Sequence, residues 1–265
     1  MSRKPGIFLA FPKSRFTFQF FVFSIRAMSS FNRLQYLFTF EYCMQNPLPH
    51  IIRDNTFWVS TERCLFWEDK HTLIVSDLHL GKTGHFRKEG IAIPPTVYKA
   101  DLQRLIAQLY FFKAERILIV GDLTHSKANK ELDLFLKWRK DFSLLHFELV
   151  KGNHDILDDS WYNDAGIVLH EQELVIGDFC FRHERDPNQV AEPSPAAPFI
   201  FSGHIHPGIR IKGRGKQSLR FPCFYFTPRH CILPAFSRFT GTYRVEPQKG
   251  ETVYAIVETE LVRMD

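Results

Sequence analysis

The chain has 265 residues, of which 45% are hydrophobic and 24% charged, as is typical of a globular protein. Its five cysteines are odd in number and show no CxxC spacing, which argues against a disulfide framework or zinc finger and favours reduced thiols in the cytoplasm. The formal net charge is +5, but residues 44–265 hold 28 basic and 28 acidic residues, which excludes a globally basic nucleic-acid binder.

Residues 1–43 form a phenylalanine-rich stretch with ten of the 27 phenylalanines, six basic residues and one acidic residue. Its apolar run between Arg15 and Arg26 is ten residues long, too short to span a bilayer, so we expect no stable membrane association. Three explanations stay open: a start that truly lies at Met28 or Met44, a targeting segment, or a real extension, ordered or disordered. We expect the folded domain to span residues 44–265.

Between residues 72 and 155, short apolar runs alternate with amphipathic segments. Buried strands are predicted for the apolar runs in "TLIVSD", "RILIVGD" and "HFELVKGNHD". Helices are predicted for residues 94–113 and 129–140, where the apolar residues have helical spacing. This β-α-β-α-β order predicts a largely parallel sheet. After Gly166 only strands are expected, in a mostly antiparallel second sheet that includes "HCILPAFSRFTGTYRV" as strand. The predicted fold class is α/β with an α+β-like four-layer arrangement, in which two packed mixed β-sheets form a sandwich flanked by α-helices.

Metal-ligating side chains follow five of these strands. Ligands bind beyond the carboxyl ends of strands in open α/β sheets, so we expect these groups to converge. The candidate ligands are Asp77, His79, Asp122, Asn153, His183, His204 and His206. Seven mixed nitrogen and oxygen ligands, with one bridging carboxylate, suit two divalent metal ions of the kind that serve phosphoryl transfer. Imidazole with carboxylate favours Mn²⁺, Fe or Zn over calcium or magnesium.

In this order, "DLH", "GD", "GNHD", "H" and "GHIHP" resemble the motifs of the calcineurin-like metallophosphoesterase superfamily. The longer stretches "SDLHLGKTGHFRKEGIAIP" and "SGHIHPG" resemble the ligase-associated DNA damage response endonucleases, manganese-dependent phosphoesterases of bacteria. The resemblance covers residues 57–262. It implies the calcineurin-like phosphoesterase fold, DNA as substrate, and a functional link to a DNA ligase and a helicase.

The resemblance also implies roles for the site residues. One metal would be held by Asp77, His79 and His206, and the other by Asn153, His183 and His204, with Asp122 bridging. His154 would be the catalytic histidine, Asp155 could orient it, and a metal-bound hydroxide would attack the phosphorus. The chain departs from the family at "RHE", where Glu184 follows His183 in place of the commoner glycine.

Basic residues flank the motifs and suggest substrate contacts. The candidates are Lys82, Arg87, His125, Arg210, Lys212 and Arg214. Our leading hypothesis is a phosphodiesterase that acts on nucleic acid, as a DNA endonuclease in repair. A small-molecule phosphodiesterase or nucleotide pyrophosphatase is the alternative, since the same centre serves many phosphate esters, and a non-catalytic scaffold is a third reading. Three properties stay open at this point: the oligomeric state, cleavage at internal positions or at ends, and DNA or RNA as the substrate.

Overall fold

The structure is a computed structural model that describes residues 46–82, 96–125, 130–184, 197–213 and 217–265. All of these residues belong to one compact unit, Gln45–Asp265. The predicted boundary after residue 43 lies outside the described residues.

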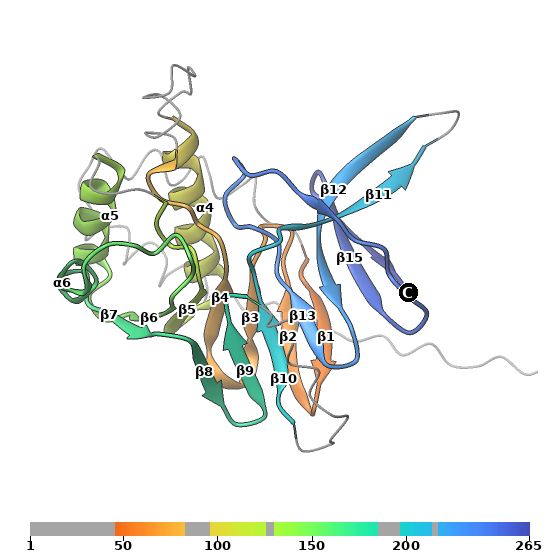
Figure 1. The fold of residues 1–265 in the computed structure, drawn as a ribbon, viewed down its shortest axis with the longest axis horizontal. Coiled ribbons are helices and arrows are strands. Elements are labelled where there is room, and N and C mark those ends of the chain that lie inside the picture. The colour runs from red at the N-terminus through yellow and green to blue at the C-terminus, as the bar shows by residue number, and fades with distance from the viewer. Residues whose placement is uncertain (1–45, 83–95, 126–129, 185–196, 214–216) are drawn as a thin grey trace, which may run out of the picture. The chain divides into compact units, whose positions relative to one another are not determined.

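The first sheet has seven strands among the described residues, in the order β1 to β7 (Figure 1). They are β1 (Leu48–Ile52), β2 (Asn55–Val59), β3 (Leu65–Trp67), β4 (Thr72–Val75), β5 (Arg116–Val120), β6 (His146–Val150) and β7 (Ile167–His170). Strands β1 to β4 pair antiparallel, and β4 to β7 pair parallel. The apolar run of β4 is buried along its whole length, as expected for a strand covered on both faces.

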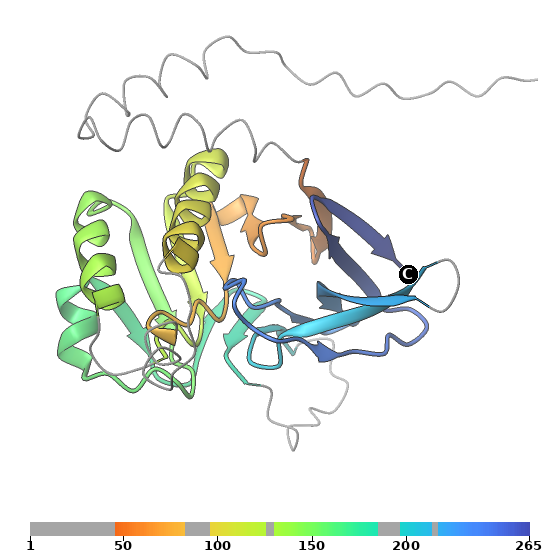
Figure 2. The same cartoon turned by 90° about the horizontal axis from the view of Figure 1, so that it is seen from above.

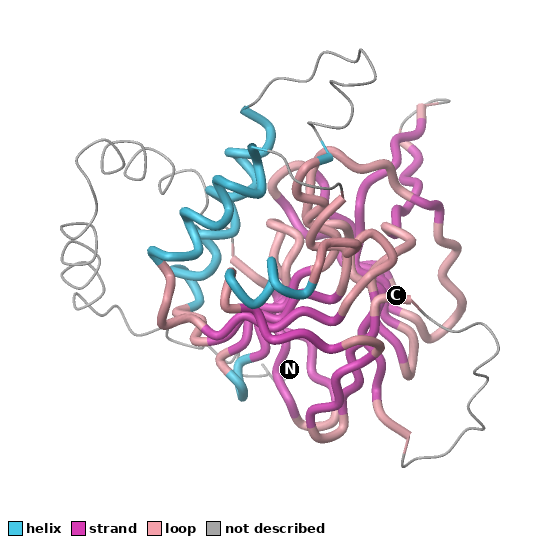
Figure 3. The backbone as a smooth tube through the Cα atoms, turned by 60° about the vertical axis from the view of Figure 1, so that its left-hand side comes forward, coloured by secondary structure: helices cyan, strands magenta, loops and turns pink. Residues whose placement is uncertain are grey.

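Helices cover one face of this sheet. They are α4 (Thr96–Phe112), α5 (Lys130–Asp141) and α6 (Asp159–Asp164), with the short 3-10 helix η1 (Glu68–Lys70) after β3. Phe112 of α4 stacks on Phe66 of β3, and Phe135 and Trp138 of α5 contact Phe147 of β6. Figures 2 and 3 show the described helices gathered on one side of the strands.

The second sheet has nine strands within the described part of the chain and is mixed. They are β8 (Glu173–Ile176), β9 (Phe179–Arg182), β10 (Phe199–Ser202), β11 (Pro207–Lys212), β12 (Ser218–Phe226), β13 (His230–Ile232), β14 (Tyr243–Arg244), β15 (Thr252–Val257) and β16 (Glu260–Met264). Strands β9, β10 and β13 are parallel neighbours, while β8–β9, β11–β12 and β15–β16 are antiparallel hairpins.

A core rich in aromatic residues joins the two sheets. Phe57 of β2 lies against Trp67 of β3 and reaches across to Phe201 of β10, with 5.0 Å between the phenyl centroids. Phe181 of β9 stacks on Phe201 at 5.1 Å. Each fully buried phenylalanine contributes roughly 1.5–3 kcal/mol of transfer free energy, so these contacts hold the sheets face to face. The predicted sandwich of two mixed sheets is confirmed.

Several predicted elements need correction. The strands of residues 48–67 and helix α6 were not predicted. Strand β7 belongs to the first sheet, where it continues the parallel order beside β6, rather than to the second. Only His230–Ile232 and Tyr243–Arg244 of the stretch "HCILPAFSRFTGTYRV" form strands, because the backbone of Leu233–Ser237 leaves the sheet to contact other segments. No helix among the described residues is both long and apolar enough to cross a membrane.

Candidate metal centre

The seven predicted ligands come together at the carboxyl ends of strands from both sheets. Parallel strands β4, β5 and β6 end at one edge, and the loops after them carry four of the ligands. The other three follow β9 and β10 of the second sheet. The ligands and the strands that they follow are Asp77 and His79 after β4, Asp122 after β5, Asn153 after β6, His183 after β9, and His204 and His206 after β10.

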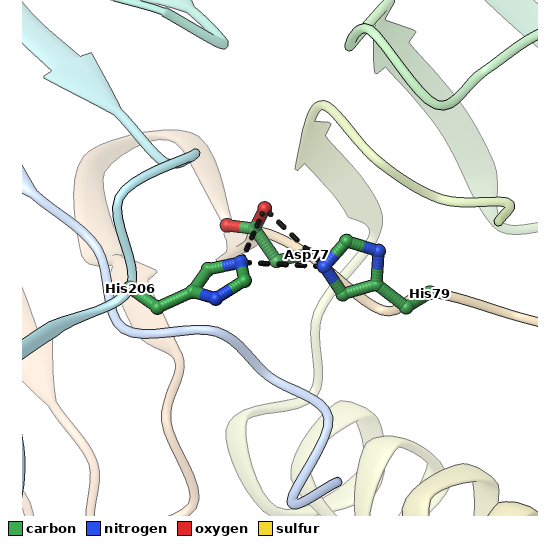
Figure 4. A group of neighbouring side chains, drawn as sticks. All are labelled: Asp77, His79 and His206. Atoms are coloured by element: carbon green, nitrogen blue, oxygen red, sulfur yellow. Dashed lines mark hydrogen bonds and ion pairs between the residues drawn. The ribbon is translucent and has the colours of Figure 1, made fainter. Parts of the chain in front are cut away.

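Asp77, His79 and His206 form one cluster (Figure 4). The Oδ1 atom of Asp77 lies 3.2 Å from Nε2 of His206 and 3.8 Å from Nε2 of His79. The two Nε2 atoms are themselves 3.2 Å apart. Three ligand atoms that converge from two sheets on one point are the arrangement a divalent metal requires.

Asp122 links this cluster to a second group. Its Oδ1 atom lies 3.3 Å from Nε2 of His183, and its Oδ2 atom lies 3.9 Å from Nδ1 of His79. Asp77, Asp122 and His183 also have ligand atoms within 4.8 Å of one another. The carboxylates of Asp77 and Asp122 therefore lie between the two groups of histidines, where a bridging ligand would stand.

Asn153 and His204 complete the second group. Oδ1 of Asn153 lies 3.2 Å from Nδ1 of His204, and the rings of His183 and His204 are 5.2 Å apart. Glu184, the departure from the family pattern, reaches within 3.8 Å of Nε2 of His204. Nδ1 of His204 therefore faces the other ligands while its Nε2 faces a carboxylate, as in many metal-binding histidines.

The donor atoms fit metal ions. Oδ1 of Asp77, Nδ1 of His79 and Nε2 of His183 are buried without a hydrogen-bond partner, whereas buried polar groups are nearly always bonded. Nδ1–H of His183 donates to the carbonyl of Val120 at 3.0 Å, so Nε2 is the ring nitrogen that faces Asp122. Burial lowers the pKa of His183, but its interactions with Asp122 and Asp77 outweigh burial and raise the pKa to about 9, so a metal would take the place of a proton on Nε2. Two divalent metals, one on each side of the centre, would take up Oδ1 of Asp77 and Nε2 of His183.

The charges of the ligands also suit a cation. Burial lowers the pKa of His79 to about 3, more than nearby Asp77 can raise it, so its imidazole is neutral as metal binding requires. Burial raises the pKa of Asp122, but its interaction with His183 and the hydrogen bond from the backbone N–H of His154 outweigh burial and bring the pKa to about 2. The bridging carboxylate is therefore ionised.

Backbone strain is concentrated at the ligands. Five of the seven have positive φ values, namely Asp77 (55°), His79 (51°), Asp122 (53°), His204 (69°) and His206 (51°). A non-glycine residue in this region costs on the order of 1–3 kcal/mol and persists only where the surroundings enforce it. The fold therefore holds the ligand loops in unfavourable conformations that aim the side chains inward.

Glycines in the motifs allow the two sheets to approach at this site. A Cβ atom at Gly203 would lie 1.8 Å from Oγ of Ser76, and one at Gly121 would lie 2.1 Å from Nδ1 of His183. Any side chain at either position would push a ligand aside. The glycines of "GHIHP" and "GD" are thus required by close packing.

His154 stands at the rim of the cluster. Its backbone N–H donates to Oδ1 of Asp122 at 3.0 Å, while its Nε2 lies 4.0 Å from Oδ2 of Asp122. The side chain is 42% exposed, so its imidazole is open to a substrate.

The expectation that Asp155 orients the His154 ring needs correction. Its carboxylate accepts hydrogen bonds from the backbone N–H groups of Thr124 and Gly152, both at 2.9 Å. Burial raises the pKa of Asp155 to about 6, against the hydrogen bonds that lower it. Asp155 therefore ties together the two loops that carry Asp122 and His154.

The predicted substrate contacts divide into three groups. The ring centroid of His125 lies 4.5 Å from that of His154 and 5.3 Å from that of His79. Burial lowers the pKa of Lys82 while the charges of Asp77 and Asp122 raise it, which places its ammonium group near the cluster. Arg210 and Lys212 are exposed on β11, whereas Arg87 and Arg214 lie outside the described residues.

Sequence reasoning missed Ser76. Its buried hydroxyl donates to Oδ2 of Asp77 at 2.6 Å and lies 2.7 Å from the carbonyl of Val120. This contact fixes the carboxylate so that Oδ1 points at His206. The signal in the sequence was a single polar residue between the apolar run of β4 and the first ligand.

Comparison with known proteins agrees with this geometry. The sequence profile of the calcineurin-like phosphoesterases matches residues 70–188, which include the first four motifs. The crystal structure of the nuclease MPE from Pseudomonas putida is 27% identical, covers 82% of this chain and 100% of its own, and has a TM-score of 0.68. A protein of unknown function from Aquifex aeolicus is 17% identical over 55% of this chain and 82% of its own, with a TM-score of 0.36, too low to carry an argument. No curated protein matched.

Proposed function

We propose that this chain, which belongs to the calcineurin-like phosphoesterases and is a metal-dependent phosphoesterase, is a nuclease that hydrolyses phosphodiester bonds of DNA at internal positions. The observation that carries the proposal is the set of Asp and His side chains that converge from strained loops, with Oδ1 of Asp77, Nδ1 of His79 and Nε2 of His183 buried without hydrogen-bond partners. The nuclease from Pseudomonas putida, similar over its whole length, supports a nucleic-acid substrate.

Each side of the centre would hold one divalent metal, with Mn²⁺ first and Fe or Zn as the other candidates. Two such ions supply Lewis acidity and a water of lowered pKa at a phosphodiester. The first would be held by Asp77, His79 and His206, and the second by Asn153, His183 and His204, with Asp122 shared.

Protein side chains perform the remaining steps. The Nε2 atom of His154 is exposed beside the cluster, where it protonates the leaving oxygen. Its position is set by the bond from its backbone N–H to Asp122, and Asp155 holds the loops together. Lys82, whose charge interacts with Asp77 and Asp122, and His125, which lies beside His154, would contact the non-bridging oxygens of the phosphate.

A basic hairpin next to the centre supports a polymeric substrate. Strand β11 begins directly after His206 and carries Arg210 and Lys212, both exposed. Arg210 is the cross-strand partner of Arg220 on β12, so the hairpin places two arginines opposite each other. Phosphates on one side of the cleaved bond would contact this hairpin.

A salt titration tests the substrate class. With Mn²⁺ present, we expect nicking of supercoiled plasmid to fall steeply as salt rises, because each phosphate contact releases counterions. Hydrolysis of bis-p-nitrophenyl phosphate should change little. Equal salt dependence for the two substrates would favour the small-molecule phosphodiesterase, and no metal-dependent cleavage of either would contradict the proposal.

We also propose that the protein acts in a bacterial cytoplasm and serves DNA repair. The family resemblance implies a functional link there to a DNA ligase and a helicase. Cys180, Cys223 and Cys231 are free and buried thiols, which supports a reducing compartment. Deletion of the gene should sensitise the source cells to DNA damage. Normal survival of the deletion strain under several kinds of damage would contradict the repair role.

A further inference from the structure

A segment without an assigned role crosses between the two halves of the metal centre. It is Leu233–Ser237, which follows β13 and is called here the crossing segment. Its backbone N–H groups donate to three carbonyls: Leu233 to Ser202 at 2.7 Å, Phe236 to Ser76 at 2.8 Å, and Ser237 to Asp77 at 3.2 Å. Ser202 precedes the loop of His204 and His206 in the second sheet, and Ser76 and Asp77 follow β4 in the first.

The crossing segment therefore connects ligands that come from different sheets. The N–H of Asp77 donates to the carbonyl of Gly121 on one side, while its own carbonyl accepts from Ser237 on the other. At the second sheet, the N–H of His204 donates to Oδ2 of Asp77 at 3.2 Å. The distance of 3.2 Å between Asp77 and His206 depends on how these backbones are held.

Two arginines hold the crossing segment. Nη1 of Arg63 donates to the carbonyls of Ala235 at 3.2 Å and Ser237 at 2.8 Å. Nη2 of Arg104 donates to the carbonyl of Phe236 at 2.6 Å, and its guanidinium lies 4.4 Å from the centroid of the Phe236 ring. Three consecutive carbonyls are thus bonded by guanidinium groups.

The two arginines are partly removed from water for this purpose. Arg104 is 6% exposed and is paired with Asp101 at 2.8 Å and Glu62 at 3.4 Å. Burial lowers the pKa of Arg63 to about 10, helped by the charges of Arg104 and Arg238. An apolar side chain could fill the same space, but only a planar, forked donor can fix several carbonyls at once.

We propose that Arg63 and Arg104 are positioning residues that hold the crossing segment and thereby set the separation of Asp77 from the His204–His206 loop. They act through the backbone and touch neither metal nor substrate. This inference rests on the metal site of the proposed function, since it concerns the geometry that the ligands offer to an ion.

Binding of Mn²⁺ to metal-stripped protein tests the inference by calorimetric titration. We expect Arg63→Gln and Arg104→Gln each to raise the Kd for Mn²⁺ by roughly 10- to 100-fold, the usual effect of losing groups that orient metal ligands. Each titration is made at a temperature where circular dichroism shows the variant folded.

Arg139 on α5 provides a matched control. It is also buried, donates to the carbonyls of Phe142, Leu145 and Gly166, and lies 4.3 Å from the ring centroid of Phe147, away from the centre. Arg139→Gln should lower the melting temperature and leave the Kd for Mn²⁺ unchanged. Equal weakening by Arg139→Gln would show a general effect of stability and would overturn the inference.

A conservative variant decides the case if Arg104→Gln does not fold. Arg63→Lys keeps the charge but reaches one carbonyl instead of two, so we expect it to recover part of the affinity that Arg63→Gln loses. Wild-type affinity in all folded Arg63 and Arg104 variants would overturn the inference. A wild-type protein that binds no Mn²⁺ would instead overturn the metal site itself.

Discussion

Asp122 is the residue that we propose both metals share. Its two carboxylate oxygens face His183 and His79, its backbone is strained, and it also accepts the N–H of His154. His154 lies beside it but belongs to neither group of converging ligand atoms. The two residues should therefore respond differently to substitution.

We expect Asp122→Asn to lose metal as well as activity, because the amide removes the negative charge shared between two cations. Metal content measured by mass spectrometry after gel filtration should fall below that of the wild type. His206→Ala should behave in the same way, since His206 completes the cluster with Asp77. Full metal content in both variants would contradict the proposed ligand set.

We expect His154→Ala to retain its metals and slow DNA cleavage by about 10²–10⁴-fold, the usual effect of a positioned acid–base group. The loss should be smaller for bis-p-nitrophenyl phosphate, because p-nitrophenolate leaves without a proton. Rates with both substrates, beside the metal content, check this. Loss of metal in His154→Ala would place the residue among the ligands instead.

At the scale of elements, strand β1 at the edge of the first sheet contacts the second sheet through the side chain of His50. The His50 ring lies 4.0 Å from that of Phe226 on β12, and Nδ1 lies 3.0 Å from Oη of Tyr254 on β15. Burial lowers the pKa of His50 to about 4, helped by the charge of Arg263 and opposed by Asp265.

This pKa predicts a pH dependence of stability. Between pH 6.5 and about 4, the unfolded chain binds a proton at His50 that the folded chain does not, so stability is present above pH 6.5 and is lost as the pH falls. The slope is at most about 1.4 kcal/mol per pH unit and is reduced by solvent screening. Urea unfolding at pH 7 and pH 5 should show a smaller loss for His50→Gln than for the wild type.

The β11–β12 hairpin carries a second prediction at this scale. Arg210→Gln with Lys212→Gln should weaken DNA cleavage and reduce its salt slope by about 2, because two phosphate contacts are lost. Hydrolysis of the small diester should remain unchanged. The control neutralises two exposed lysines of α5, Lys137 and Lys140, and should alter neither substrate. Equal loss on both substrates would indicate that the hairpin has a structural role.

For the whole molecule, the proposed domain boundary predicts that a chain beginning at Met44 keeps the solubility, melting temperature and activity of the full chain. The described strands begin at Leu48 and form, with the strands that follow, a core that spans both sheets. Differential scanning fluorimetry and the plasmid assay check this. A large fall in melting temperature would show that residues 1–43 stabilise the domain.

The sequence by itself determined the order of buried strands and the ligand types that follow them. Continuous apolar runs such as that of β4 signal burial on both faces, and the polar residue that ends each run is local information. For this reason the sandwich of two sheets could be predicted, and so could the gathering of the candidate ligands at the ends of the strands. The extension of the first sheet by β1 to β3 and β7 could not, because strand pairing depends on distant partners.

Only the tertiary structure decided how the site is held. Asp155 ties two loops together, and Ser76 donates to the carboxylate of Asp77. Arg63 and Arg104 bind the carbonyls of the crossing segment, and these hydrogen bonds join residues as far as 174 positions apart. The apolar pattern of "HCILPAF" is typical of one strand, yet its last residue, Phe236, has left that strand and donates to the carbonyl of Ser76 in the first sheet. A local sequence pattern indicates whether a residue is buried. Which residue it bonds to across the site is determined only when the two sheets pack together.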